Sequence, residues 1–285
     1  MLARRAGPRP RATMPDVSER VAVLGAGKMG EALLSGLLRA GRPASDLLFT
    51  ERHDERTKLL EERYGVTGVT TAEAAERADT LLVAVKPQEM GALLEELAES
   101  VSPRNLVITI AAGIPTAFLE QRLAEGVPVV RVMSNTPVFV DQAMSAISPG
   151  AHAGEEHLAR TEELLRPVGK VIRVPESQLD AVTALSGSGP AYFFFLVEAM
   201  IDAGILLGLP RAVAAELIVQ TAIGSAVMLR DSGEHPVQLR EAVTSPGGTT
   251  IAAIRELENH GVRAALLAAL EAARDRSRAL AEGQA

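Results

Sequence analysis

The sequence of 285 residues contains no cysteine. This absence excludes disulfide bonds, thiolate nucleophiles and cysteine-based metal sites. Histidine is scarce, and none of its positions lies in a glycine-rich loop or at the end of an expected strand. The five histidines are His53, His152, His157, His235 and His260. Because there is no H-E-x-x-H motif, no other cluster of ligand residues and no serine in a nucleophile elbow, the sequence predicts no metal site and no serine hydrolase.

Basic charge is in short supply as well. The formal net charge is -7, and no basic stripe with interleaved aromatic residues runs through the body of the chain. Nucleic acid is therefore not expected as a partner. The longest apolar stretch, residues 190–197, is too short to span a bilayer and is followed by Glu198 and Asp202. We expect a soluble, cytoplasmic protein that does not bind membranes and is long enough for two domains.

The first residues of the chain differ from the rest. The stretch MLARRAGPRPRAT is rich in arginine and proline and contains no acidic residue. We interpret residues 1–17 as a disordered N-terminal extension, one that could simply precede a second start at Met14. A transit peptide shares the arginine-rich character, but the prolines leave no amphipathic helix.

Residues 21–30, VAVLGAGKMG, are the stretch around which the chain is organised. A short apolar run is typical of a buried parallel strand, and Gly25, Gly27 and Gly30 follow it in G-x-G-x-x-G spacing. A helix is predicted over residues 31–40, and a second strand over residues 47–50 ends at Glu51. This context predicts a dinucleotide site whose phosphates lie at the helix N-terminus. The alternative is a structural turn in another α/β fold.

Further strand patterns, at residues 80–85, 106–110, 127–133, 144–147 and 170–174, alternate with helix patterns. This alternation predicts an α/β fold with a Rossmann-type, doubly wound parallel sheet over residues 18–175. Ligands bind beyond the carboxyl ends of such strands. We therefore expect residues 86–87, 111–113 and 135–137 to gather with the glycine-rich turn along one edge.

From residue 176 to residue 285 the pattern is helical throughout, which predicts a second, all-helical domain. The helix expected over residues 191–207, AYFFFLVEAMIDAGILL, is apolar nearly all round and should be buried on most sides. A helical domain of this size cannot easily surround it, so we infer a partner subunit. The alternative is that the nucleotide domain covers it.

Two glycine-rich loops in the helical half are candidate substrate loops. They are LSGSGPAY, residues 185–192, and VTSPGGTT, residues 243–250. In the second, glycines and a helix N-terminus could present N–H groups to a carboxylate. Taken singly, each loop could also be a turn with a helix cap. Oxidising an alcohol needs a base; since none is obvious apart from Lys86 or Glu198, reduction of a C=N bond is favoured.

Together these motifs resemble those of the pyrroline-5-carboxylate reductase family. The resemblance covers residues 19–280 and rests on VAVLGAGKMG, AVKP (residues 84–87), AAG (111–113), RVMSNTP (131–137), LSGSGPAY and VTSPGGTT. Ser134 departs from the RVMPNTP of many members. The resemblance implies hydride transfer from NAD(P)H to the C=N bond of 1-pyrroline-5-carboxylate, giving L-proline in the last step of proline biosynthesis. It also implies that the helical domain forms a homodimer, in many members part of a larger assembly.

The resemblance implies the site residues too. The substrate loop would comprise Ser245, Gly247, Gly248, Thr249 and Thr250. Backbone N–H groups of Gly248, Thr249 and Thr250 would bind the carboxylate, and the Thr250 hydroxyl would lie near the ring nitrogen as the catalytic group. The cofactor would be bound by Leu24, Gly25, Ala26, Gly27, Lys28, Met29, Gly30, Glu51, Arg52, Ala84, Val85, Lys86, Pro87, Ala111, Ala112, Gly113 and Asn135.

The choice of cofactor rests on the residues after the second strand. Glu51 would bond a ribose 2′-OH and favour NADH, whereas Arg52 suits a 2′-phosphate. Arg56 and Lys58 lie nearby but also fit a solvated helix face. NADPH is predicted, with NADH as the alternative.

Two other functions remain open at this stage. A β-hydroxyacid dehydrogenase shares the two-domain plan, but its pattern has a catalytic lysine on the helix where residues 191–200 contain none. A dinucleotide sensor or scaffold would have no use for the loop at residues 243–250.

Overall fold

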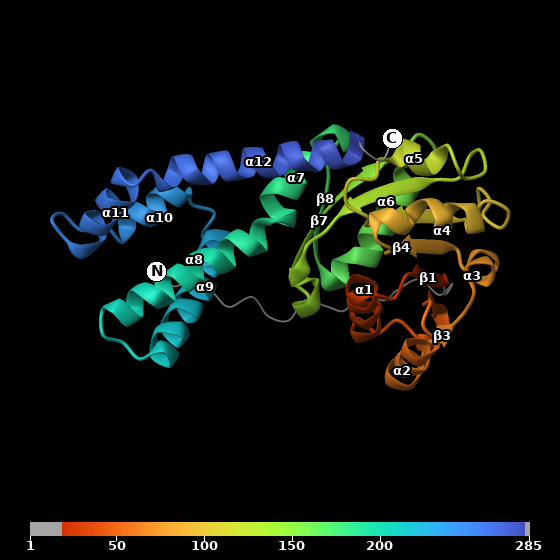
Figure 1. Cartoon of the computed structure of the whole chain (residues 1–285), viewed down its shortest axis with the longest axis horizontal. Coiled ribbons are helices and arrows are strands. Elements are labelled where there is room, and N and C mark those ends of the chain that lie inside the picture. Colours follow the sequence, from red (N-terminus) through yellow and green to blue (C-terminus); the bar gives the residue numbers. More distant parts are fainter. Residues whose placement is uncertain (1–18, 283–285) are drawn as a thin grey trace.

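The computed structural model describes residues 19–282, so the extension expected over residues 1–17 lies outside the described part of the chain. One half of the molecule is an eight-stranded sheet covered by helices, and the other half is an elongated group of helices (Figure 1). The strand order is β3-β2-β1-β4-β5-β6-β7-β8. The order reverses between β1 and β4, and in sheets of this kind ligands bind at that point.

The strands are short and apolar, as the sequence predicts. Their bounds are β1 Val21–Leu24, β2 Leu47–Thr50, β3 Thr67–Gly68, β4 Thr80–Val83, β5 Leu106–Thr109, β6 Val129–Met133, β7 Ala143–Pro149 and β8 Gly169–Arg173. Strands β1, β4 and β5 are buried along their whole length, because helices cover both faces of the sheet. The neighbouring strands in the run β3-β2-β1-β4-β5-β6 all pair in parallel, which brings the carboxyl ends of these strands to one edge of the sheet.

Two cores result, one on each face. Alternate residues of β1 divide between them: Val21 and Val23 point to one core, Ala22 and Leu24 to the other. The first core is closed by α1 (Lys28–Arg39), α2 (Asp54–Tyr64) and α6 (Glu155–Leu165). The second is closed by α3 (Thr71–Arg77), α4 (Met90–Leu97) and α5 (Thr116–Glu120).

The sequence led us to expect a sheet that is parallel throughout, and this expectation is wrong. Strand β7 runs antiparallel to β6, with Val132 opposite Ile147, and β8 is again parallel to β7. The physical reason is the short connection over residues 134–142, which holds only a 3-10 turn (Thr136–Val140). A parallel neighbour needs a crossover long enough to contain a helix, and α6 supplies one only between β7 and β8.

The second half is helical, as expected. After α7 (Leu179–Val182) the chain forms a π-helical turn (Thr183–Gly187), and then α8 (Gly189–Leu206), α9 (Arg211–Ser232), α10 (Pro236–Ala242), α11 (Thr249–Asn259) and α12 (Val262–Glu282). Helices α8 and α9 form an antiparallel pair that extends away from the sheet, and α12 returns along the molecule from the α11 end (Figure 1).

Within one chain α8 is uncovered. No residue of α8 is buried, and Phe195 is 69% exposed. The alternative that the sheet half of the same chain covers this helix is therefore wrong, and the exposed apolar surface is consistent with the inferred partner subunit. Two stretches, Glu176–Leu206 and Arg211–Ser232, are even long and apolar enough to cross a membrane by length and composition. Neither stretch is an uninterrupted apolar run, since the first contains Glu198 and Asp202 and the second contains Glu216.

Candidate active site

The glycine-rich turn joins β1 to α1 at the point where the strand order reverses. Gly25 has φ +90°, and a Cβ there would lie 2.7 Å from Val85 Cγ1. At Gly30 a Cβ would lie 2.3 Å from the Gly25 carbonyl oxygen. Each of these glycines is therefore required by the backbone itself, the first for the turn and the last for close packing of helix on strand.

Gly27, the middle glycine, has a different surrounding. A Cβ there would meet nothing within 4 Å, so the space beside the backbone is open. Gly27 is also the N-cap of α1 and offers no side-chain cap. The first N–H groups of α1 consequently lack intrahelical partners and stand at the positive end of the helix dipole. Open space beside unpaired N–H groups fits the pyrophosphate of a dinucleotide.

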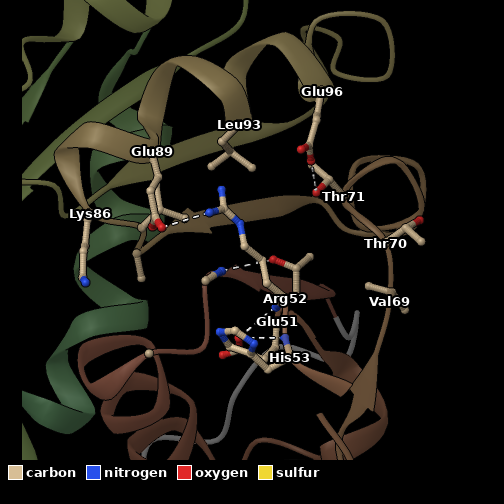
Figure 2. A pocket seen from close by; sticks show the side chains of 15 residues that line it. Glu51, Arg52, His53, Val69, Thr70, Thr71, Lys86, Glu89, Leu93 and Glu96 are labelled. Carbon is tan, nitrogen blue, oxygen red and sulfur yellow. Dashed lines mark hydrogen bonds and ion pairs between the residues drawn. The ribbon is translucent and has the colours of Figure 1, made fainter. Parts of the chain in front are cut away.

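A pocket opens next to this turn, at the carboxyl ends of β1, β2 and β4 (Figure 2). Its lining includes several residues that the sequence assigns to the cofactor. These are Gly25, Gly27, Glu51, Arg52, Ala84, Val85 and Lys86. Residues that the sequence analysis did not single out also line it, among them Val69 and Leu93. Their apolar side chains suit the ring of an adenine, and the loop after β3 that carries Val69 gave no sequence signal.

The two residues that bear on cofactor choice are arranged very differently. Arg52 is 63% exposed and forms an ion pair with Glu89 across the pocket, with 2.9 Å between Nη1 and Oε1. The Glu51 side chain is only 11% exposed. Its Oε1 accepts hydrogen bonds from the backbone N–H groups of Arg52 and His53, at 2.8 and 3.3 Å. The guanidinium thus faces the pocket while the carboxylate is turned toward its own backbone.

Other predicted cofactor residues lie at the same edge but outside this pocket. Asn135 is buried; its amide donates to the Ser186 carbonyl (3.1 Å) and its oxygen accepts from the Met144 N–H (2.9 Å). Gly113 lies against the C-terminal end of α12, since a Cβ there would be 3.5 Å from Leu280 Cβ. These positions tie the sheet edge to the helical half.

The loop at residues 185–192 begins as the π-helical turn after α7. Gly187 packs on the end of β6, where an added Cβ would lie 2.3 Å from Met133 Cε. Single π turns recur at functional sites because they redirect a helix locally. Here the turn brings the Ser186 carbonyl onto Asn135.

The second loop precedes α11. Gly247 has φ +69°, the Gly248 N–H donates to the Ser245 carbonyl (3.1 Å), and Gly248 is the N-cap of α11. Thr249 and Thr250 occupy the first turn of the helix. This end of α11 lies at the tip of the helical half, far from the nucleotide pocket of the same chain (Figure 1). One chain therefore does not bring its predicted substrate and cofactor residues together.

Among residues 19–282, no group of three or more histidine, aspartate or glutamate side chains is placed to hold a metal ion. The pocket and the turn instead offer backbone N–H groups and one exposed guanidinium to an anionic dinucleotide.

A glycine-rich turn at a sheet's reversal point, joined to a helical half, defines a two-domain, dinucleotide-dependent oxidoreductase. Comparison with known families agrees. Residues 20–113 match the family described as NADP oxidoreductase, coenzyme F420-dependent. Residues 176–280 match the family described as pyrroline-5-carboxylate reductase dimerisation.

Relatives cover almost the whole chain. The pyrroline-5-carboxylate reductase of Corynebacterium melassecola is 44% identical over 264 residues, covering 91% of this chain and 98% of its own. That of Mycobacterium tuberculosis is 45% identical over 284 residues, covering 92% and 96%. A Coxiella burnetii pyrroline-5-carboxylate reductase superposes with a TM-score of 0.87 at 34% identity, covering 93% and 99%. A Plasmodium falciparum pyrroline carboxylate reductase with NADP bound gives 0.83 at 28% identity, covering 92% and 98%.

The chain belongs to the pyrroline-5-carboxylate reductase family. It is accordingly an NAD(P)H-dependent oxidoreductase of proline biosynthesis, which confirms the resemblance inferred from the motifs.

Proposed function

We propose that the protein reduces the C=N bond of 1-pyrroline-5-carboxylate to give L-proline in the cytoplasm. NAD(P)H supplies the hydride from C4 of its nicotinamide. The observation that carries the proposal is the 44% identity to the Corynebacterium melassecola reductase across 91% of the chain. The space around Gly27, which suits a pyrophosphate, supports it from the structure.

The loop before α11 is proposed as the substrate site. The N–H groups of Thr249 and Thr250 open the helix, where a carboxylate is favoured. The N–H of Gly248, at the N-cap, would exchange the Ser245 carbonyl for that carboxylate. An added Cβ at Gly248 would lie 2.3 Å from Ser245 Oγ, so Ser245 packs against the turn and shapes it together with Gly247. The Thr250 hydroxyl then orients the ring nitrogen for hydride attack at the neighbouring carbon.

A second copy of the chain is proposed to complete the site. Each copy would offer its α11 loop to the nucleotide pocket of the other, because one chain keeps the two apart. The exposed apolar side chains of α8 and α9, such as Phe194 and Ile223, supply the surface for association. The match of residues 176–280 to a dimerisation family supports a homodimer, and larger assemblies would add further dimers.

We also propose that residues 18–175 act as the dinucleotide-binding domain and residues 176–285 as the dimerisation and substrate domain. Asn135 and the 111–113 loop then serve at the junction, next to the nicotinamide end of the cofactor, while Gly25 to Gly30 hold the pyrophosphate.

NADPH is the proposed cofactor. Arg52 is exposed in the pocket and available to a 2′-phosphate, whereas both oxygens of Glu51 already have partners. Arg52 would exchange the Glu89 carboxylate for the phosphate on binding. A bidentate guanidinium–phosphate pair is stronger than the exposed ion pair that it replaces.

The first test is the rate of NADPH and NADH oxidation by the purified protein with pyrroline-5-carboxylate present. Rapid, substrate-dependent oxidation with a higher kcat/KM for NADPH is expected. Cofactor binding without turnover would overturn the reductase proposal and favour a dinucleotide sensor.

The second test distinguishes a shared site from a self-contained one. Thr250→Ala impairs the substrate loop and Gly27→Ala the cofactor turn. At an NADPH concentration well below saturation, each variant alone should therefore have no more than about a tenth of wild-type activity. Random pairing of the two should restore about a quarter of wild-type activity, because half the dimers are mixed and each has one intact site. No restoration in a protein that forms mixed dimers would show that each chain uses its own loop.

Association and solubility are tested together by size-exclusion chromatography without detergent. A monodisperse dimer or a multiple of it is expected. Recovery only from a detergent extract would instead assign α8 and α9 to a membrane.

A further inference from the structure

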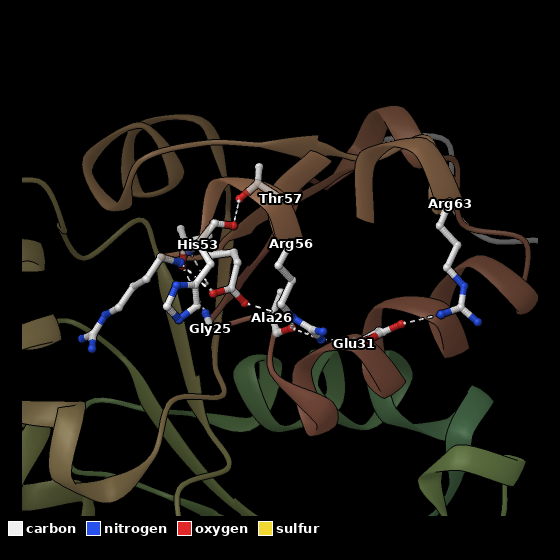
Figure 3. A network of polar contacts seen from close by, with 10 residues as sticks. Gly25, Ala26, Glu31, His53, Arg56, Thr57 and Arg63 are labelled. Atoms are coloured by element: carbon white, nitrogen blue, oxygen red, sulfur yellow. Dashed lines mark hydrogen bonds and ion pairs between the residues drawn. The ribbon is translucent and has the colours of Figure 1, made fainter. Parts of the chain in front are cut away.

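Arg56, in the first turn of α2, lies at the centre of a polar network beside the glycine-rich turn (Figure 3). Its Nε and Nη2 donate to the Ala26 carbonyl, at 3.1 and 2.8 Å. Nη2 also donates to Glu31 Oε2 on α1, at 2.8 Å. Nε lies 3.2 Å from Oε2 of Glu51, at the end of β2. One guanidinium thus joins the turn, the helix that follows it and the acidic residue at the mouth of the pocket.

Glu31 holds Arg56 in place. Its Oε1 accepts from Arg63 Nη1 at 3.1 Å and from the Tyr64 hydroxyl at 2.8 Å. Burial, together with the hydrogen bond to Glu31, raises the pKa of Tyr64 above its ordinary value, so the phenol remains a donor. The Glu31 side chain is largely buried and satisfied on both oxygens. Arg56 is therefore fixed by structure and is not a freely solvated residue of a helix face.

Arg56 affects cofactor binding through its ion pair with Glu51. With Oε1 on the Arg52 and His53 backbone and Oε2 facing Arg56, its carboxylate is oriented and its charge is compensated. An acidic residue at this point in a dinucleotide fold bonds the ribose 2′-OH of NADH and repels the 2′-phosphate of NADPH. A fixed guanidinium 3.2 Å from the carboxylate reduces that repulsion.

We propose that Arg56 is a positioning residue that sets cofactor choice by holding and neutralising Glu51. The inference deepens the proposed preference for NADPH and rests on the same pocket. Arg52 attracts the 2′-phosphate directly, and Arg56 reduces the electrostatic repulsion between that phosphate and the Glu51 carboxylate. The chain can therefore carry Glu51 at a position typical of NADH enzymes and still accept NADPH.

The contact with Ala26 has a separate consequence. It holds the carbonyl of the glycine-rich turn, which binds the pyrophosphate common to both cofactors. Loss of the contact with Ala26 weakens the binding of NADPH and of NADH equally, whereas loss of the contact with Glu51 weakens the binding of NADPH alone. The ratio of the two kcat/KM values therefore isolates the proposed effect from a purely structural one.

The test compares this ratio, and the dissociation constants of NADP⁺ and NAD⁺, in four proteins: wild type, Arg56→Ala, Glu51→Gln and the double variant. Arg56→Ala is expected to lower the NADPH:NADH ratio about tenfold, or about 1.4 kcal/mol. In the double variant, where Glu51 carries no charge to unmask, the ratio should return to within about threefold of wild type. Glu51→Gln alone should change it less than about threefold, because Arg56 already compensates the charge.

Arg63→Ala is the matched control. Arg63 contacts Glu31 but neither Ala26 nor Glu51, so the ratio should stay within about twofold of wild type. Should Arg56→Ala not fold, Arg56→Gln removes the charge while keeping a donor for the Ala26 carbonyl and carries the same comparison.

An unchanged ratio in the Arg56 variant, or a double variant as low as the single one, would overturn the inference. A wild type that prefers NADH but whose ratio still falls in Arg56→Ala would overturn the NADPH preference alone.

Discussion

Gly27 and Gly30 lie in the same turn, yet replacing each with alanine should have a different outcome. At Gly30 the new Cβ would lie 2.3 Å from a backbone carbonyl oxygen, whereas ordinary contacts begin at 3.4 Å. About 1 Å of backbone movement is needed, since no flexible side chain can yield. Overpacking of this kind costs about 2 kcal/mol, within the range of 1–3 for inserted methylenes. In a chain of this size that is a loss of about 4–8 °C in Tm.

At Gly27 the new methyl group would meet no protein atom within 4 Å. The backbone, at φ −65° and ψ −168°, is also accessible to alanine. The free energy of unfolding should therefore change by less than about 0.5 kcal/mol. The methyl group would instead occupy the space proposed for the pyrophosphate, and the Kd for NADP⁺ should rise at least tenfold, or by about 1.4 kcal/mol.

The assay is thermal unfolding of both variants beside wild type, with titration of NADP⁺ at a temperature where all three are folded. Gly30→Ala should lose stability and binding, Gly27→Ala binding alone. An equal loss of Tm in both variants would contradict the geometry of the turn. If Gly27→Ala bound NADP⁺ as tightly as wild type, the pyrophosphate would not bind in the space beside Gly27.

Further outcomes follow from other parts of the structure. Thr250→Ala should lower kcat on the order of tenfold or more with an unchanged Kd for NADP⁺, while Thr250→Ser keeps most of the rate; equal rates for Thr250→Ala and wild type would remove the hydroxyl from the reaction. Phe195→Asp places a charge on the exposed face of α8 and should shift the protein toward smaller species in light scattering; an unchanged mass would place the contact surface elsewhere. Arg39 donates two hydrogen bonds to Asp141 (3.1 and 2.6 Å) and so lowers the pKa of that carboxyl below its usual value. Because the pKa of Asp141 is lower in the folded state than in the unfolded chain, the pair stabilises the folded state at pH values above the ordinary pKa of an aspartate. This stabilisation is lost as the pH falls through the lowered pKa. Arg39→Gln should therefore cost less than about 1 kcal/mol at pH 7, because the pair is exposed, and its Tm difference from wild type should shrink below about pH 4; a difference that grows in acid would contradict this origin.

The sequence predicts the fold well where local pattern and global topology agree. The apolar runs of β1, β4 and β5 are typical of buried strands, so these strands could be recognised. The glycine spacing after β1 is common by itself, and the turn could be recognised because a strand pattern precedes it and a helix pattern follows it. The direction of β7 could not be. Strand pattern is the same in parallel and antiparallel pairs, and only the brevity of residues 134–142 carries the information.

Several boundaries also moved. Helix α1 begins at Lys28, three residues before the predicted start, because the glycine-rich turn itself enters the helix. The helical sequence pattern of residues 116–124 continues past Glu120, where helix α5 ends. The helical pattern of residues 179–185 divides in the structure into α7 and a π turn. Terminal turns depend on contacts that periodicity does not encode.

Side-chain partners were the hardest feature to predict. Arg56 looks like one of several charges on an amphipathic helix, and nothing local distinguishes it from Lys58. Its role depends on Ala26, Glu31 and Glu51, which the fold brings together from three other elements. In the same way, α8 could be recognised as a helix that needs a partner subunit, but the sequence does not say which surface of that partner covers it.

The described part of the helical half has almost no core of its own: beyond residue 175, the buried apolar residues are Leu179, Ala184 and Ala214. Its stability must therefore be drawn from association, and the free energy of that association depends on how much protein is present. The unfolding equilibrium then includes dissociation of the chains, so Tm should rise with protein concentration and activity should decay on dilution. A chain with a defective loop would still associate. By the proposed exchange of loops, it would leave the pocket of its healthy partner incomplete, while the partner's intact loop would complete the pocket of the faulty chain. A mixed dimer would therefore keep one working site, and that site would lie on the chain that carries the defect.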